Sequence, residues 1–163
     1  MVENIQADIS IELFNDLSKN YNLIPIYKVI EKGKKTPVSV YKNLKNHANT
    51  FLLESVEGNK NFARYSFIGF NPNKIIKTGD KEKFKNIDPL NKLEEQLENI
   101  KTPKLEGLPE FNSGAVGFIS YEAVSYFEPS INKIEDHTSY FPESIFFITS
   151  SLIIFDNEDN KVF

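Results

Sequence analysis

A nearly uninterrupted apolar run, SIFFITSSLIIFD at residues 144–156, constrains the fold of this chain more than any other feature. The run is rich in Ile and Phe, which favour strands. Strands that are buried on both faces read as continuous apolar runs rather than as an alternation of apolar and polar residues. We therefore expect one central strand over 144–156, covered on both faces.

The residues after this run predict a hairpin. NEDNK (157–161) is polar and typical of a turn, and Val162-Phe163 would begin the returning strand. The sequence therefore ends just as the expected partner of 144–156 begins. Because natural domains rarely stop there, we expect the chain to be a fragment of a longer protein.

The other patterns alternate between helix and strand in an irregular order. We expect helices at 9–20 with Ser10 as N-cap, at 37–45 after Thr36-Pro37, and at 89–100 after Asp88-Pro89. We expect strands at 21–30, 49–58 and 62–70, a hairpin over 73–85 with Gly79-Asp80 at its tip, and a strand followed by a short helix over 111–128. This mixture predicts an α+β fold with a mixed, largely antiparallel sheet and flanking helices, and the length of 163 residues predicts a single domain over 1–163.

Composition excludes several classes of function. The net charge of −4 disfavours binding to nucleic acid or to an anionic membrane surface. The absence of cysteine excludes a disulfide framework and a thiolate metal site. No apolar run approaches the ~20 residues of a membrane-spanning helix, and the N-terminus has no signal-peptide pattern. We therefore expect a cytoplasmic protein.

Residues suited to catalysis are few. His47 and His137 lie outside any pattern typical of a nucleophilic or metal site. The glycines at Gly114 and Gly117 match neither a phosphate-binding loop nor a dinucleotide fingerprint. We therefore expect no catalytic residues and no metal ligands in this chain.

Arg64 is the only arginine beside eighteen lysines. Either chance left it there, or the position needs a planar guanidinium with several donors, which lysine does not supply.

The segment FLLESVEGNKNFARYSFIG (51–69) supports two interpretations. On a strand, polar Glu54 and Ser55 would sit among apolar residues, where each needs a partner. In the first interpretation Glu54 pairs with Arg64 and Ser55 bonds to the main chain, so the segment is purely structural. In the second, these residues form part of a small site for a zwitterion. The residues alone leave both open.

A family resemblance bears on this choice. The segments IPIYKVI, TPVSVYKNL, FLLESVEG, RYSFIGFNP and GAVGFISYEAVSYFE, in this order and spacing, resemble the N-terminal domain of anthranilate synthase component I. The resemblance covers residues 21–163. LLES and RYSFIG occur in altered form in the related aminodeoxychorismate synthase component I, and TPVS favours the anthranilate branch.

The resemblance implies a fold and a function. The chain would be the N-terminal regulatory and structural domain, part of a larger two-domain α/β sandwich whose C-terminal chorismate-binding catalytic domain is absent. The full-length protein would be a lyase that converts chorismate and ammonia, supplied from glutamine, to anthranilate and pyruvate in tryptophan biosynthesis. The alternatives are the corresponding domain of aminodeoxychorismate synthase component I, or a stand-alone binding or scaffold module of the same fold.

The resemblance also implies a site and partners. Part of an allosteric tryptophan pocket would lie on this chain, at Leu53, Glu54, Ser55, Tyr65 and Ser66. The expected partners are the feedback inhibitor tryptophan, a glutamine amidotransferase subunit (component II) and the protein's own catalytic domain. The cofactor is magnesium in the full-length enzyme, with none bound by this chain.

Overall fold

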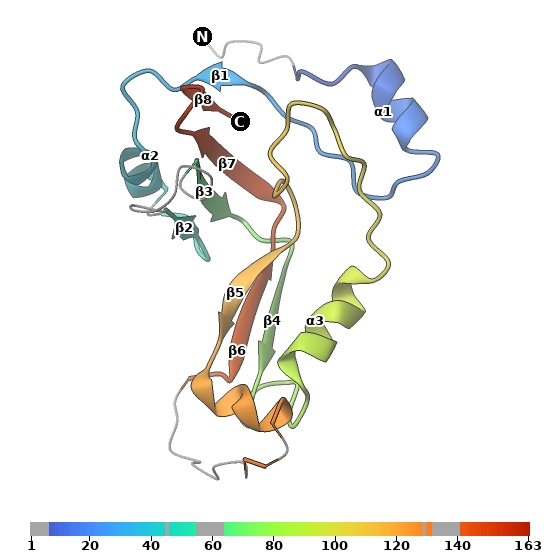
Figure 1. Ribbon diagram of the computed structural model, residues 1–163, viewed down its shortest axis with the longest axis vertical. Coiled ribbons are helices and arrows are strands. Elements are labelled where there is room, and N and C mark those ends of the chain that lie inside the picture. Colours follow the sequence, from blue (N-terminus) through green and yellow to red (C-terminus); the bar gives the residue numbers. More distant parts are fainter. Residues whose placement is uncertain (1–6, 45, 55–63, 129, 132–140) are drawn as a thin grey trace. The chain divides into compact units, whose positions relative to one another are not determined.

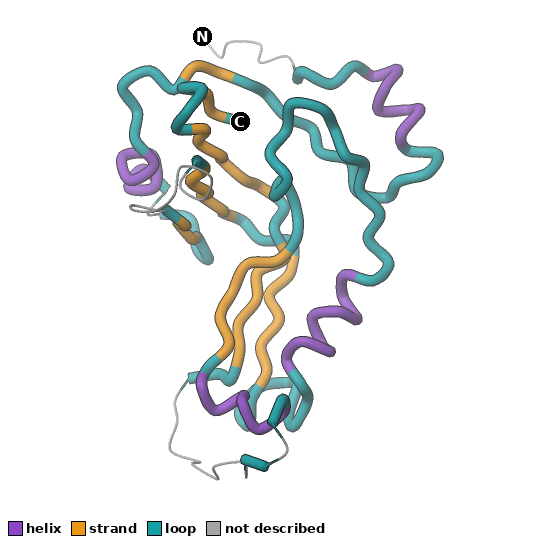
Figure 2. The backbone as a smooth tube through the Cα atoms, viewed as in Figure 1, coloured by secondary structure: helices purple, strands orange, loops and turns teal. Residues whose placement is uncertain are grey.

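The computed structural model describes residues 7–44, 46–54, 64–128, 130–131 and 141–163. The chain divides into two compact units, the first formed by Met1–Pro72, Ile100–Ser113 and Ser150–Phe163, and the second by Asn73–Asn99 and Gly114–Thr149. In chain order the elements are α1 (Ile11–Leu17), β1 (Ile30–Glu31), α2 (Pro37–Asn43), β2 (Phe51–Leu53), β3 (Tyr65–Phe70), β4 (Lys74–Thr78), α3 (Pro89–Leu97), β5 (Ala115–Ile119), the 3-10 helix η1 (Tyr121–Tyr126), β6 (Ser144–Ile148), β7 (Ser151–Asp156) and β8 (Lys161–Val162) (Figures 1 and 2).

The first unit is built on a sheet of order β1-β8-β7-β3-β2, in which every neighbouring pair is antiparallel. Helix α2 packs on one face of this sheet, over a core of Ile68, Phe155 and Val162. Local chemistry starts the helix, since Thr36 and Ser39 form a reciprocal capping box and Pro37 occupies the first turn. The helix, predicted at 37–45, is thereby confirmed.

The second unit holds a sheet of order β4-β6-β5 (Figure 1). Both strand pairs are antiparallel. Its core consists of Ile76, Phe146 and Ile148, and Leu93 and Leu97 of α3 pack against it. The side chain of Asp88 caps α3 by accepting from the N–H groups of Leu90 and Asn91, as the Asp88-Pro89 pair predicted. The expected α+β class with largely antiparallel pairing is confirmed.

The expectation of one continuous strand over 144–156 is wrong. The run forms two strands in two different sheets, β6 in the second unit and β7 in the first. Between them, Thr149 donates from its N–H and from its hydroxyl to the carbonyl of Gly114, at 2.8 and 3.0 Å, and the Ser150 hydroxyl donates to the carbonyl of Asn71. Two hydroxyl side chains thus interrupt the apolar run.

Each half of the run is nevertheless central, as expected. β6 lies between β4 and β5. β7 lies between β3 and β8, and β8 pairs with the end of β7 at Phe155 and Asp156. The predicted returning strand is present, because β8 pairs with the end of β7 through Phe155 opposite Val162.

Two other strand predictions need correction. The hairpin expected over 73–85 does not form, because the partner of β4 is β6 and the chain after Gly79 folds into a local turn closed by the Gly79 N–H on the Phe84 carbonyl. Within 21–30 only Ile30 joins the sheet. Main-chain groups earlier in that segment bond elsewhere: Asn22 and Leu23 to Lys101, and Val29 to the Asp8 carboxylate.

No helix in the described parts of the chain combines the length and the apolar character needed to span a bilayer.

Candidate functional site

Of the predicted site residues that the structure describes, Leu53 lies on β2 and Tyr65 and Ser66 lie on β3, at one edge of the five-stranded sheet. In register, Leu53 lies opposite Phe67, and Tyr65 lies opposite Asp156 of β7. Residues directly opposite in an antiparallel pair share a face, and residues two apart on one strand do so as well. Leu53, Tyr65, Phe67 and Asp156 therefore belong to one face, which we call the Tyr65 face.

The Tyr65 face carries a row of aromatic rings. The rings of Tyr65 and Phe67 lie 6.1 Å apart between centroids, and Phe67 meets Phe111 edge-on at 5.3 Å. Leu53 ends β2 beside this row with 45% of its surface exposed. Exposed apolar surface next to partly buried rings is suited to contact with a flat apolar group.

Ser66 lies on the opposite face of the same strand. Its side chain is 1% exposed, and its hydroxyl accepts a hydrogen bond from the Asn157 amide at 3.2 Å. The neighbours on this face are the core residues Ile68 and Phe155, beneath α2. The structure thus separates Ser66 from Tyr65, which the sequence prediction had grouped together.

Glu54 follows β2 and is exposed. Ser55, the central residue of the predicted pocket, lies outside the described residues. Of the five predicted residues, the structure therefore brings Leu53 and Tyr65 onto one face and places Ser66 on the other.

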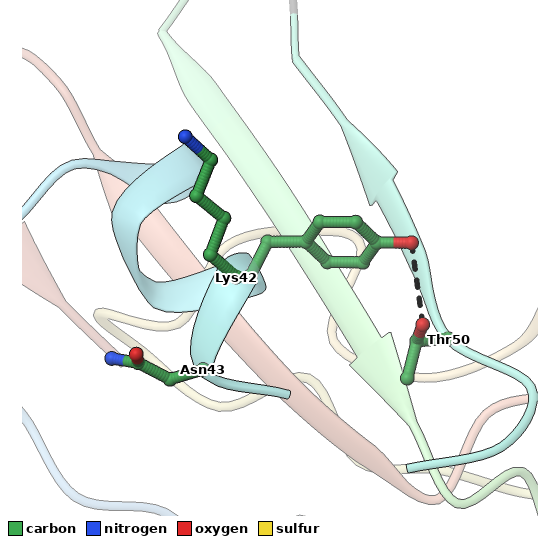
Figure 3. A pocket seen from close by; sticks show the side chains of 4 residues that line it. Lys42, Asn43 and Thr50 are labelled. Carbon is green, nitrogen blue, oxygen red and sulfur yellow. Dashed lines mark hydrogen bonds between the residues drawn. The ribbon is translucent and has the colours of Figure 1, made fainter. Parts of the chain in front are cut away.

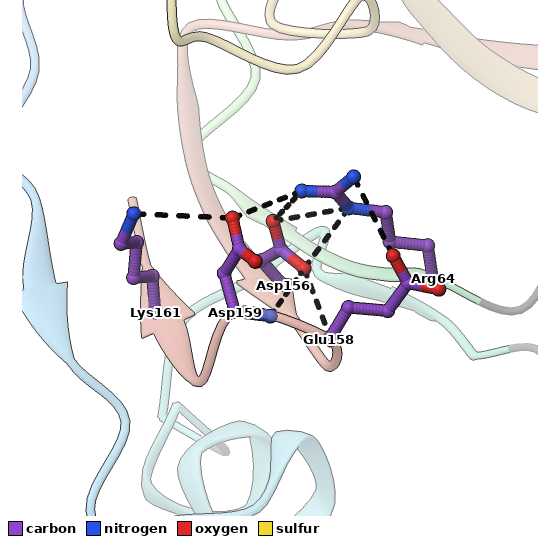
Figure 4. Close-up of polar contacts among 5 residues, drawn as sticks. All are labelled: Arg64, Asp156, Glu158, Asp159 and Lys161. Atoms are coloured by element: carbon purple, nitrogen blue, oxygen red, sulfur yellow. Dashed lines mark hydrogen bonds and ion pairs between the residues drawn. The ribbon is translucent and has the colours of Figure 1, made fainter.

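Arg64 stands at the start of β3 and is surrounded by carboxylates of the turn after β7 (Figure 4). Its Nε lies 3.1 Å from both carboxylate oxygens of Asp156, and its Nη2 lies 2.6 Å from Oδ2. Two further carboxylates contact the guanidinium: Oδ2 of Asp159 lies 3.2 Å from Nη2, and Oε2 of Glu158 lies 3.5 Å from Nη1. The position uses the planar, multidentate donor that arginine alone supplies. The structural interpretation expected Arg64 to pair with Glu54. In the structure its carboxylate partners are Asp156, Glu158 and Asp159.

Asp156 is the centre of the cluster and is only 1% exposed. Burial acts to raise the pKa of its carboxyl. The hydrogen bonds from Arg64 and from the N–H groups of Asp159 and Glu158 outweigh burial, and the pKa lies below its ordinary value. The same hydrogen bond from Arg64 to Asp156 raises the pKa of the guanidinium, which stays charged. The sequence analysis did not single out Asp156. The feature that could have identified it is its position at the end of the apolar run 144–156, where a carboxylate needs a partner.

Tyr65 responds to the same charges. Its pKa is raised by burial first and then by the nearby Asp156 carboxylate, so the phenol is neutral at physiological pH. The guanidinium carbon of Arg64 lies 5.1 Å from the centre of the Tyr65 ring, within the range of a cation–π contact.

A surface pocket of about 700 Å³ lies beside α2 in the same unit (Figure 3). Tyr41, Lys42, Asn43 and Thr50 line it, and the Thr50 hydroxyl donates to the Tyr41 hydroxyl at 3.2 Å. None of these residues belongs to the predicted tryptophan site, and the pocket holds no acid–base pair.

Within the described ranges, no group of three or more His, Asp or Glu side chains is arranged to hold a metal ion. The carboxylates of Asp156, Glu158 and Asp159 converge on the Arg64 guanidinium instead. His47 contacts the Phe70 ring and the Asn71 amide oxygen, and His137 lies outside the described residues. We therefore assign magnesium to none of the described side chains.

Comparison with known proteins decides the family. The profile of a family described as "chorismate binding enzyme" matches residues 48–163, which is most of the chain. The chain belongs to the chorismate-binding enzyme family.

Proteins named anthranilate synthase component 1 are similar to this member of the family over most of its length. The protein from Schizosaccharomyces pombe, named as probable, is 42% identical over 83% of this chain and 27% of its own length. The protein from Saccharomyces cerevisiae is 37% identical over 94% of this chain and 32% of its own length. The protein from Aquifex aeolicus is 31% identical over 97% of this chain and 34% of its own length. The predicted resemblance to component I is confirmed, and the chain spans about a third of the length of these relatives.

A solved structure agrees with this assignment to the chorismate-binding enzyme family. Anthranilate synthase component I from Streptococcus pneumoniae matches 83% of this chain and 30% of its own, with a TM-score of 0.50 and 29% sequence identity. The α+β arrangement of the described elements is thus shared with a protein of that name.

Proposed function

We propose that this chain is part of component I of an anthranilate synthase. The observation that carries the proposal is its similarity, over 83–97% of its length, to relatives of that name in yeasts and bacteria. In this proposal the chain is the N-terminal domain, and the full-length protein is a cytoplasmic lyase. It forms anthranilate and pyruvate from chorismate, and receives ammonia from a glutamine amidotransferase subunit.

The chemistry would belong to the rest of that protein. The described part of this chain has no cluster of side chains arranged to hold a metal ion. The His47 ring contacts the Phe70 ring and the Asn71 amide oxygen. Magnesium, chorismate and the transfer of ammonia are therefore proposed for a separate catalytic domain. The names of the relatives favour the anthranilate branch over the aminodeoxychorismate branch and over a stand-alone scaffold module.

We further propose that the Tyr65 face supplies one wall of an allosteric tryptophan site. Leu53 offers exposed apolar surface at the end of β2, and the rings of Tyr65 and Phe67 lie beside it on the same face. An indole ring packs well against such surfaces. Ser55 and Glu54, which follow Leu53 in sequence, would serve the polar end of the ligand.

A site of this kind regulates only if the ligand binds one arrangement of the protein better than another. We therefore propose that the second wall comes from the catalytic domain. Tryptophan would then bind the inhibited arrangement of the two domains more tightly than the active one. Ser66, which faces the core beneath α2, would support the β3 strand and would not touch the ligand.

The test is tryptophan inhibition of anthranilate formation by the full-length enzyme at fixed chorismate. Ser55→Ala should lose one hydrogen bond to the ligand and weaken inhibition by up to about tenfold. Ser55→Phe should block the wall sterically and weaken inhibition further. Glu54→Gln measures whether that carboxylate contributes to binding.

Ser18→Phe, at an exposed serine just after α1, is the matched control and should leave inhibition unchanged. A folded Ser55→Phe enzyme with wild-type inhibition would remove Ser55 from the site. A wild-type enzyme insensitive to tryptophan would refute the allosteric proposal and leave the enzymatic one standing.

A further inference from the structure

Arg64 joins the two strands that frame the Tyr65 face. Its carbonyl accepts from the Asn157 N–H at 2.9 Å, and its guanidinium binds Asp156 in the same segment. The carboxylate of Asp156 also accepts from the N–H groups of Glu158 and Asp159, at 3.1 and 3.2 Å. The start of β3 and the turn after β7 are thus held together through one buried carboxylate (Figure 4).

The same guanidinium determines what lies against Tyr65. Asp156 is the register partner of Tyr65, so its carboxylate lies beside the ring on the same face. Arg64, bound to that carboxylate, lies 5.1 Å from the ring centroid. The ring also lies 6.1 Å from the Phe67 ring between centroids, and Phe67 in turn meets Phe111. Tyr65 is therefore in contact both with the Arg64 cation and with the aromatic row.

A lysine would not reproduce this arrangement. Its ammonium is a compact point charge on a flexible stem, and it lacks the planar fork that binds a carboxylate through two parallel hydrogen bonds while stacking on a ring. At this position, the single arginine beside eighteen lysines therefore uses the planar guanidinium that lysine does not supply.

We propose that Arg64, held by Asp156, is a positioning residue for the Tyr65 face. It fixes the Tyr65 ring beside Leu53 and thereby sets the affinity of the tryptophan wall. This inference rests on the proposed function of that face, and it assigns to Arg64 no contact with the ligand.

The first experiment measures the ring itself. In the 163-residue chain, ring-labelled tyrosine gives nuclear magnetic resonance signals that Tyr65→Phe assigns. Arg64→Lys should shift the Tyr65 ring signals, whereas Lys161→Gln, which removes only an exposed cation 3.8 Å from Asp159, should not. Because Arg64 is the only arginine, its Nε–H gives a single signal, which Asp156→Asn should displace. Tyr65 signals in Arg64→Lys that coincide with those of the wild type would overturn the inference.

The second experiment measures inhibition in the full-length enzyme. Arg64→Lys should raise the tryptophan concentration for half-inhibition about two- to fivefold, because the Tyr65 ring loses the cation–π contact that positions it against the ligand. The kcat and the KM for chorismate should stay at wild-type values, which a general loss of structure would not allow. Tyr65→Leu should weaken inhibition as well, and the effects of the two changes should not add in the double variant, because Arg64 acts through Tyr65.

The outcomes separate the two proposals. If tryptophan inhibits the wild-type enzyme, two results would overturn the positioning role alone. One is a tryptophan concentration for half-inhibition that is the same in Arg64→Lys as in the wild type. The other is additive effects of the two changes in the double variant. Wild-type enzyme that tryptophan does not inhibit overturns the proposed site, and the positioning role with it. Tyr65→Leu keeps the second experiment decisive if Arg64→Lys folds poorly.

Discussion

The ring of Phe51 on β2 covers Gly69, its register partner on β3. A Cβ atom added at Gly69 would lie 2.0 Å from Cε1 of Phe51, so the ring occupies the space that any other residue would need. A second glycine is crowded in a different way, since a Cβ at Gly117 would lie 1.9 Å from the main-chain oxygen of Ile145. One obstacle is a side chain that can turn away, and the other is backbone.

This difference predicts unequal costs for two matched substitutions. Gly69→Ala should lower the free energy of unfolding by about 1 kcal/mol and Gly117→Ala by about 3 kcal/mol, the two ends of the range for overpacked sites. Urea denaturation of each variant measures both. In a Phe51→Ala background, Gly69→Ala should cost little more, because the obstacle is gone. An equal cost with and without Phe51 would contradict this explanation.

A second prediction concerns the buried hydroxyl pair in the other sheet. Thr78 and Ser144 are register partners on β4 and β6, each 0% exposed, with their hydroxyl oxygens 2.9 Å apart. Ser144→Ala or Thr78→Val alone removes one hydroxyl of this buried pair. Each should lower the free energy of unfolding by about 1–3 kcal/mol. The double variant should cost less than the sum of the two. Strictly additive costs would show that the hydroxyls do not interact.

The pH dependence of stability should report on Asp156. Because its pKa is lower in the folded state than in the unfolded chain, the unfolded chain binds more protons in acid. The stability that this carboxylate supplies is therefore complete above its ordinary pKa of 3.8, and is lost as the pH falls through the lower, folded value.

Asp156→Asn tests this directly. At pH 7 it should lower the free energy of unfolding by about 1.5–3 kcal/mol, the range for hydrogen bonds to charged groups. The gap between wild type and variant should narrow as the pH falls below 4, measured by urea denaturation across the range. Glu158→Gln, which removes a half-exposed partner of Arg64, should cost under about 1 kcal/mol. A gap that stays constant down to pH 2 would contradict the lowered pKa.

The proposed division of labour predicts that the 163-residue chain alone makes no anthranilate. Incubation with chorismate and ammonia should give anthranilate fluorescence no higher than a blank, while the full-length enzyme in the same assay gives turnover. The chain should also bind tryptophan weakly or not at all in calorimetry, since a single wall buries too little of the ligand to offset its lost translational freedom. Turnover by the chain, or micromolar binding, would refute the shared arrangement.

Local sequence signals determined where most helices and turns begin. Thr36-Pro37 and Asp88-Pro89 start α2 and α3 because the cap and the first turn involve only neighbouring residues. The polar segment after Asp156 forms the predicted turn for the same reason, and Val162 returns as predicted. The sequence prediction grouped Tyr65 and Ser66 in one site, although neighbouring residues on a strand point to opposite faces.

Only the tertiary structure decided which distant residues meet. The apolar run 144–156 reads as one strand because its composition reports burial and not the identity of the neighbours. It becomes two strands because Thr149 bonds to Gly114 and Ser150 to Asn71, partners far away in sequence. Arg64 likewise pairs with Asp156, 92 residues along the chain, and not with nearby Glu54. The sequence required a partner for each buried polar group, but the choice of partner depends on long-range packing that no local pattern encodes.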